Sequence, residues 1–185
     1  MYRELDDALG LAPAACKRLA DACIGKNGRH AIVGMFRQSA FGRLGRYEHV
    51  NDASRLPHAP AIRWIIGGNV AKGSGASSSQ MGRFETNWPA KPENLATLID
   101  LSGNWTDQVA KRRSRKRVVL DMDSSGSPTY VHQEKSVWNG HFGCTYYSPL
   151  FACNQFGDRE RCALRPGNAR CADGWEDVLT PIIAR

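Results

Sequence analysis

The chain has 185 residues, enough to bury one sizeable hydrophobic core, or a small helical unit beside part of a second domain. Hydrophobic residues make up 42% of the sequence, which excludes wholesale disorder, and the longest apolar runs are far too short to span a bilayer. The 25 lysines and arginines exceed the 18 acids and give a formal net charge of +7. This excess favours a polyanionic partner such as DNA or RNA, although an ordinary basic protein can also carry it.

The N-terminal segment is charged and amphipathic and lacks the apolar stretch of a secretory signal. We therefore expect a cytoplasmic protein with no membrane partner. The six cysteines do not follow zinc-site spacing, so a zinc site has little support. In a reducing compartment we expect free thiols that are mostly buried.

Helical periodicity dominates the first hundred-odd residues. Apolar residues recur at helical spacing over 13–24, and the glycines that follow supply a stop. A second amphipathic pattern covers 29–47, where most arginines lie off the apolar stripe and form a basic outer surface. Prolines punctuate a short helix around 62–66, in which we expect Trp64 to lie in the core.

A segment rich in glycine and serine, 67–79, indicates a loop, and Ser79 is the predicted N-cap of the next helix. Pro92 opens a longer helix that runs out into a basic stretch at 111–117. Such a charge run is either a solvated linker or a contact for nucleic-acid phosphates. The candidate phosphate contacts are Lys111, Arg112, Arg113, Arg115, Lys116 and Arg117.

The pattern changes abruptly at Arg117. Residues 118–120 form a short apolar run that ends in acids, as a buried strand does. Segments at 138–147, 150–154 and 160–164 are rich in aromatic and β-branched residues, and they predict a meander of further strands.

Two features of this second half concern packing. We expect Trp138, Tyr146 and Tyr147 to pack within the sheet, the alternative being a platform on which bases stack. A final helix begins at 172–175, and the sequence offers it no packing partner, which suggests a domain cut short.

The acids that follow the first strand are the candidate catalytic and metal-binding residues. Asp121 and Asp123 stand two residues apart, so a strand presents both carboxylates on one face. Such a pair repels unless solvent or a cation separates the charges, and Mg²⁺ suits a site shared with phosphate. The alternative is that one acid only caps the following turn, with Ser124 and Ser125.

Several short motifs, spread over nearly the whole chain, together resemble the motifs of one known protein family. They are RELDDAL at 3–9, GRHA at 28–31, VLDMDSSGSPT at 119–129, WNGHFGC at 138–144, PLF at 149–151, NQFGD at 154–158, LRPGN at 164–168 and ADGW at 172–175. Each motif alone is weakly specific. Together they resemble DDE-type bacterial insertion-sequence transposases.

That resemblance implies an α+β chain in which a helical region, 1–110, has a DNA-binding role and precedes a basic connector, 111–117. Residues 118–185 would then be the opening part of a ribonuclease-H-like domain. The implied activity is Mg²⁺-dependent cleavage and joining of DNA at the inverted repeats of a mobile element. The family pattern favours Asp123, with Ser125, as the first catalytic acid and leaves Asp121 as the alternative.

Two departures from the family pattern bear on activity. Relatives usually carry His-Gly and then Gln after the acid strand; here Gln133 matches, but Val131 replaces the glycine, and we expect a strained turn. The family's second Asp and its Glu are not matched by the other acids, which are Glu134, Asp158, Glu160 and Asp173. Because one carboxylate pair cannot hold two Mg²⁺ ions, we expect an inactive N-terminal fragment.

Two alternatives remain open on the sequence alone. The chain could be a non-catalytic module that occupies inverted repeats, with a full-length transposase or a second copy of itself as a further partner. It could also be a basic structural or interaction protein unrelated to transposition.

Overall fold

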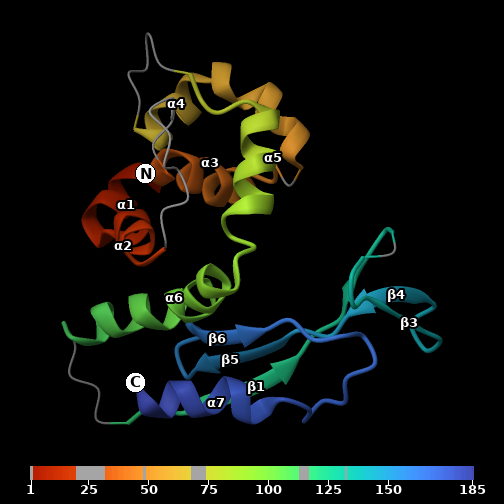
Figure 1. The fold of residues 1–185 in the computed structure, drawn as a ribbon. Coiled ribbons are helices and arrows are strands. Elements are labelled where there is room, and N and C mark those ends of the chain that lie inside the picture. Colours follow the sequence, from red (N-terminus) through yellow and green to blue (C-terminus); the bar gives the residue numbers. More distant parts are fainter. Residues whose placement is uncertain (1, 20–31, 48, 68–73, 113–116, 132) are drawn as a thin grey trace. The chain divides into compact units, whose positions relative to one another are not determined.

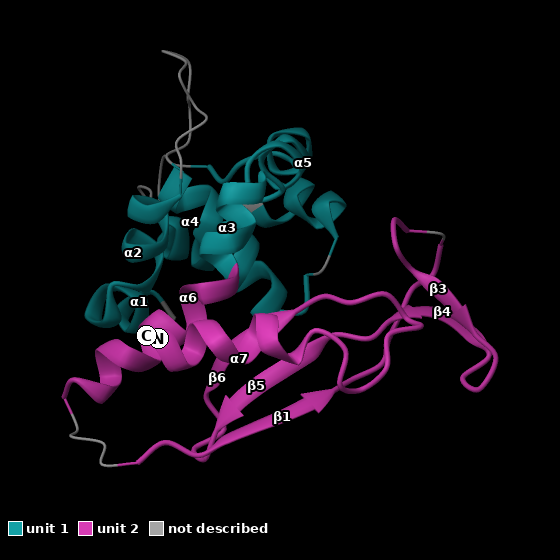
Figure 2. Cartoon of the chain, turned by 60° about the horizontal axis from the view of Figure 1, so that its bottom comes forward, with its two compact units in different colours: residues 1–98 teal, residues 99–185 magenta. Residues whose placement is uncertain are grey.

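The computed structural model describes residues 2–19, 32–47, 49–67, 74–112, 117–131 and 133–185. The chain forms two compact units, residues 1–98 and residues 99–185 (Figure 2). The first unit is helical and the second combines two small antiparallel sheets with helices. The predicted α+β class is confirmed by this composition.

Unit 1 is built from short helices (Figure 1). They are α1 (Tyr2–Leu9), α2 (Leu11–Arg18), α3 (Ile32–Leu44), the 3₁₀ helices η1 (Val50–Ser54) and η2 (Leu56–His58), α4 (Pro60–Ile66) and α5 (Ser78–Asn87). Helix α6 (Pro92–Ala110) begins in unit 1 and continues into unit 2, and Pro92 opens it as predicted.

Buried polar side chains tie the helices of unit 1 together. Asp6 is only 1% exposed; its carboxylate pairs with Arg37 at 2.6 Å and accepts the backbone N–H of Ala12 at 2.7 Å. Gln38 donates to the carbonyl of Ala76 and accepts its N–H, both at 2.8 Å. Because each of these buried polar groups has a hydrogen-bond partner, their burial costs little folding free energy. The bonds also fix α1, α2 and α3 relative to one another.

Two expectations for unit 1 are wrong in detail. Trp64 is 54% exposed, because it lies two residues from the buried Ile62 and so points to the opposite side of α4. The N-cap of α5 is Ser77, not Ser79; Ser77 and Gln80 form a reciprocal capping box. The predicted helix over 29–47 is present as α3, while the later part of the one over 13–24 falls outside the described residues.

Unit 2 contains two three-stranded antiparallel sheets, with orders β1-β5-β6 and β2-β4-β3. Their strands are β1 (Leu120–Ser124), β2 (Ser127–Pro128), β3 (Val137–Asn139), β4 (Cys144–Tyr147), β5 (Leu150–Asn154) and β6 (Arg159–Ala163). The predicted strands are therefore present, but they divide between two sheets and do not form one continuous meander. The expected burial of the first strand is wrong, because β1 lies at the edge of its sheet and the preceding Val118 and Val119 are exposed.

Helix α7 (Trp175–Ala184) does have a packing partner, contrary to the sequence expectation. Val178, with no exposed surface, packs on Leu150 and Ala152 of β5, and Met122 and Ile182 border this cluster. Residues 178 and 182 are one helical turn apart and so share a face, which covers one side of the β1-β5-β6 sheet (Figure 1).

Helix α6 also approaches this sheet closely. A Cβ atom placed on Gly103 would come within 2.4 Å of the carbonyl oxygen of Glu160 in β6. Glycine at 103 thus permits the contact. Asp107 of α6 pairs with Arg185 at 2.8 Å, and Arg185 also reaches the buried carboxylate of Glu160.

Candidate functional site

The two candidate acids lie together on β1, as predicted. Asp121 and Asp123 are exposed, while the residues between and beside them are partly buried, so both carboxylates project from one face of the strand. Met122 projects from the other face, toward the core beneath α7. The acids therefore occupy the face of the sheet that α7 leaves uncovered.

The neighbours of the acids on that face come from β5 and β6. Asp121 is paired with Cys153 and Asp123 with Phe151 across the strands. The guanidinium carbon of Arg159 lies 4.7 Å from the centre of the Phe151 ring, a cation–π contact. The acids thus border a half-buried aromatic ring and a positive charge.

This arrangement supplies only part of a metal site. Two carboxylates on an exposed face give oxygen ligands of the type that Mg²⁺ prefers, with solvent access for its waters. Over the described ranges, no group of three or more His, Cys, Asp or Glu side chains is placed to hold a metal ion. The two carboxylates can therefore supply part of the ligand set of one ion. By themselves they do not complete a two-ion centre.

The backbone just before β1 is bound by a side chain that the sequence analysis did not single out. Gln155, just after β5, accepts the N–H of Val119 at 2.9 Å and donates to the carbonyl of Arg117 at 3.1 Å. This two-sided contact fixes the chain where the basic connector meets the acidic strand. The amide of Gln155 makes both bonds because it carries a donor and an acceptor, but the pairing across 36 residues has no local sequence signal.

Part of the basic connector is described. Lys111 and Arg112 are exposed in the turn that follows α6, and Arg117 is exposed before β1. The remaining predicted phosphate contacts, Arg113, Arg115 and Lys116, lie outside the described residues.

The comparison with known families decides which class of protein this is. The chain matches the family model described as "Transposase DDE domain group 1" over residues 1–185. The chain belongs to this transposase family. Neither a curated protein nor a solved structure matches it significantly.

Membership gives the chain a transposase-type function, and its combination of helices with two small antiparallel sheets is consistent with part of a ribonuclease-H-like DDE domain. DDE transposases bind DNA and generally use a divalent metal ion. Within the described ranges, no helix is both long and apolar enough to cross a membrane.

A buried arginine organises the part of the transposase domain that leads into α7. Arg165 donates to the carbonyls of Ser148 at 2.9 Å and Asp173 at 2.6 Å, and to those of Arg170 and Cys171 at 3.1 Å. It therefore joins the β4–β5 turn to the loop before α7. The LRPGN segment contributed to the family resemblance, but the role of its arginine depends on partners that only the fold assembles.

The three aromatic residues of the β2-β4-β3 sheet divide between its faces. Tyr146 is buried, and its hydroxyl accepts a hydrogen bond from Asn139 at 2.9 Å. Trp138 is 64% exposed and shares the other face with Tyr147, because register pairs it with Thr145. Sheet packing was thus predicted correctly for Tyr146 and wrongly for Trp138.

Other expectations for this transposase domain also need correction. The strained residue after the acid strand is Lys135, with φ 63°, and not Val131, which does not have a positive φ. The expected burial of the thiols is wrong: Cys16, Cys144, Cys153 and Cys162 are half-buried and Cys171 is exposed, all of them free. Cys23 lies outside the described residues.

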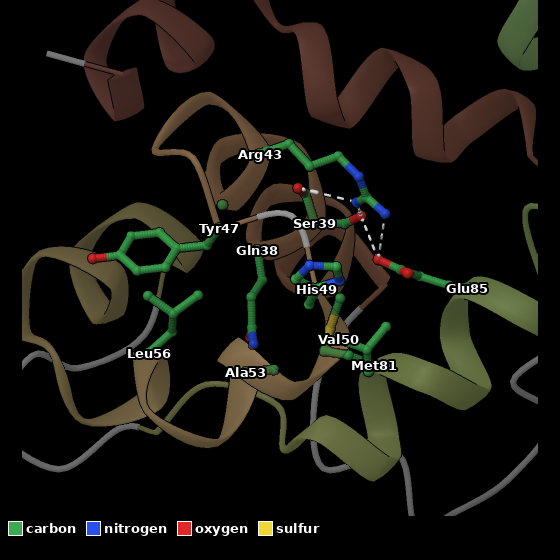
Figure 3. A pocket seen from close by; sticks show the side chains of 11 residues that line it. Gln38, Ser39, Arg43, Tyr47, His49, Val50, Ala53, Leu56, Met81 and Glu85 are labelled. Carbon is green, nitrogen blue, oxygen red and sulfur yellow. Dashed lines mark hydrogen bonds and ion pairs between the residues drawn. The ribbon is translucent and has the colours of Figure 1, made fainter. Parts of the chain in front are cut away.

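Unit 1 contains a small open pocket between α3, η1 and α5 (Figure 3). Val50, Leu56 and Met81 supply apolar lining, and Arg43 and Glu85 form an ion pair at 3.0 Å beside them. The pocket holds none of the residues that the sequence analysis singled out as catalytic.

Proposed function

We propose that the chain carries the first metal-binding acid of a bacterial insertion-sequence transposase that cleaves and joins DNA at the inverted repeats of its element. Asp123 is the proposed first acid, with Asp121 beside it, and Mg²⁺ is the proposed ion. The observation that supports this assignment is the placement of both carboxylates on the uncovered face of β1 in a DDE family member.

Three consecutive segments have different roles in this proposal. Residues 1–110 are a helical, DNA-binding region, 111–117 is a basic connector that meets phosphates, and 118–185 opens the nuclease domain. Gln155 holds the connector's last carbonyl and the start of β1, so it positions the acids relative to the connector. The protein acts in the cytoplasm on DNA, with a second transposase chain as a further partner.

The 185-residue chain by itself is proposed to bind DNA without cutting it. Two-metal phosphodiester chemistry needs further carboxylates beside Asp121 and Asp123, and over the described residues no group of three or more His, Cys, Asp or Glu side chains is placed to hold a metal ion. The test is incubation of the chain with an end-labelled duplex of the terminal repeats flanking its gene, with and without MgCl₂. Sequence-preferring binding without cleavage is the expected result.

Other outcomes of that assay separate the alternatives. Cleavage by the 185-residue chain would contradict the proposed inactivity. Binding that is equally tight to any duplex and steeply salt-dependent would remove the role in repeat recognition. No binding even at low salt would leave a basic interaction protein.

The acids are tested separately by Mn²⁺ binding, followed through water-proton relaxation. Asp123→Asn should weaken Mn²⁺ binding more than Asp121→Asn, whereas Glu134→Gln removes an exposed acid elsewhere in unit 2 and should leave it unchanged. Equal Mn²⁺ binding in all three variants and the parent would contradict the assignment of Asp121 and Asp123 as metal-binding acids. DNA affinity of the double Asp→Asn variant should be unchanged or slightly higher, because phosphate attraction does not depend on these acids.

The connector is tested by salt dependence. Replacing the six basic residues of 111–117 by glutamine should flatten the plot of log affinity against log salt concentration, by about 0.9 for each phosphate that the chain no longer neutralises. An unchanged slope would move the phosphate contacts to another part of the chain.

A further inference from the structure

Arg46 adopts a backbone conformation that arginine rarely takes. Its φ is 65°, in the left-handed region, where a Cβ atom is unfavourable and glycine is common. Within the described ranges, Arg46 and Lys135 are the residues other than glycine that have positive φ. Gly45 comes directly before Arg46 but does not itself have a positive φ.

The end of α3 imposes this conformation. The N–H of Tyr47 bonds to the carbonyl of Gly42 at 2.9 Å, and the N–H of Arg46 bonds to that of Arg43 at 3.0 Å. These two bonds define a Schellman motif, in which the residue at the position of Arg46 is left-handed and usually glycine. The helix end therefore requires the backbone geometry but not the arginine side chain.

The helix dipole does not account for the arginine either. A cation near a helix C-terminus is favourable, but the last turn of α3 already contains Arg43. Any lysine or arginine inside that turn would serve without left-handed strain. An arginine at such a position, which neither the helix end nor the dipole requires, points to a contact of its side chain with a ligand.

The charge of Arg46 is uncompensated by its described neighbours. Arg46 is exposed and has no side-chain partner among the residues whose structure is described. The carboxylate of Glu85 is occupied by Arg43 at 3.0 Å and by the hydroxyl of Ser39 at 2.9 Å (Figure 3). Asp52 accepts the backbone N–H of His49 at 3.2 Å, and Glu48 lies outside the described residues.

Groups suited to a phosphate backbone flank Arg46. Tyr47 and His49 are both exposed, and both line the rim of the pocket together with Arg43 (Figure 3). A guanidinium, a phenol and an imidazole can all donate hydrogen bonds to phosphate oxygens.

We propose that the turn at the end of α3 is a second DNA contact of this chain, in which Arg46 binds a backbone phosphate and Tyr47 and His49 lie beside it. This inference rests on the proposed DNA-binding function and adds a surface in unit 1 to the basic connector. The two backbone bonds of the Schellman motif fix the main chain at Arg46, so only side-chain freedom is lost when it binds.

The experiment uses Arg46→Gly and Arg46→Asn in the full chain, because both residues tolerate a left-handed backbone and neither carries charge. Affinity for a fluorescein-labelled duplex is measured by anisotropy between about 50 and 200 mM KCl, and thermal unfolding is followed by circular dichroism. Arg83→Gln is the matched control, since it removes an exposed charge from α5 in the same unit.

Both Arg46 variants should lower the salt slope by about 0.9, the value for one phosphate contact, while their unfolding midpoint stays equal to that of the parent or rises. Arg83→Gln should leave the slope unchanged. An unchanged slope in the Arg46 variants, an equal fall in Arg83→Gln, or a lower unfolding midpoint would overturn the inference. If the parent binds no duplex at low salt, the proposed function itself fails, whereas normal binding by the Arg46 variants defeats the inference alone.

Discussion

The carboxylate of Asp6 and the guanidinium of Arg37 form a 2.6 Å ion pair in which both side chains are almost completely buried. Asp6→Ala leaves the guanidinium without this partner in a desolvated position and should cost about 3 kcal/mol of unfolding free energy. Urea denaturation measures the loss. Asp7 also contacts Arg37, at 3.1 Å, but its side chain is half exposed, so Asp7→Asn should cost less than about 1 kcal/mol. Equal losses in the two variants would contradict the importance assigned to burial.

Arg165 holds the loop before α7 through carbonyl groups alone. Arg165→Met should destabilise the protein by about 3 kcal/mol, because it leaves the carbonyl of the buried Ser148 and three further carbonyls in the loop before α7 without this donor. Arg165→Lys should recover little, since an ammonium cannot reproduce the planar set of donors. Thermal unfolding gives the comparison, with Arg170→Ala as a control whose exposed side chain should matter little. A lysine variant as stable as the parent would show that charge alone suffices.

Tyr146 and Trp138 should respond oppositely to truncation. Tyr146→Ala removes a buried ring and should cost about 3 kcal/mol, whereas Trp138→Ala removes an exposed one and should change stability by less than about 0.5 kcal/mol. Both values follow from chemical denaturation. A large loss in the Trp138 variant would mean that this side chain packs against the protein after all.

Cys16 should react slowly with alkylating reagents. Burial is the main cause that raises the pKa of its thiol to about 11, with a smaller opposing effect of Arg37. At about pH 8.5 Cys16 should therefore hold little thiolate, and peptide mass spectrometry after a short iodoacetamide pulse should label the exposed Cys171 first. Faster labelling of Cys16 would refute the assigned environment.

The same pKa shift has a consequence for stability. Because the folded-state pKa lies above the ordinary value near 9, the fold favours the neutral thiol. Its contribution is fully present below pH 9 and is lost as the pH rises toward 11. Cys16→Ser should reduce this alkaline sensitivity, which is measured as the unfolding midpoint between about pH 8 and pH 11.

Local sequence patterns predicted the structure correctly wherever the geometry of a single helix or strand fixes the position of a residue. The two-residue spacing of Asp121 and Asp123 places them on one strand face whatever surrounds the strand. Pro92 similarly opens α6, because its missing N–H costs nothing in the first helical turn. The family resemblance, spread over segments from 3 to 175, agrees with the match over the whole chain.

Prediction failed where burial depended on partners distant in the sequence. Trp138 and Tyr146 have similar local sequence surroundings, but only Tyr146 lies on the side against which the loop containing Gly167 packs. A Cβ atom at 167 would come within 2.4 Å of the carbonyl of Tyr146, so this approach depends on glycine. No periodicity records such a pairing between segments so far apart in the chain.

By itself, the sequence determined the helical first part and strand-rich second part, the positive charge and the shared face of the two acids, because each of these follows from neighbouring residues or from composition. The family was indicated separately, by the resemblance of its scattered motifs. Only the tertiary structure decided that α7 covers the face opposite those acids, through Val178 on Leu150 and Ala152. It alone also placed Arg46 in a left-handed turn, exposed and without a side-chain partner among the described residues. The physical reason is range: dihedral preferences and side-chain period act over a few residues, whereas burial and charge balance are set by whichever segments the fold brings together.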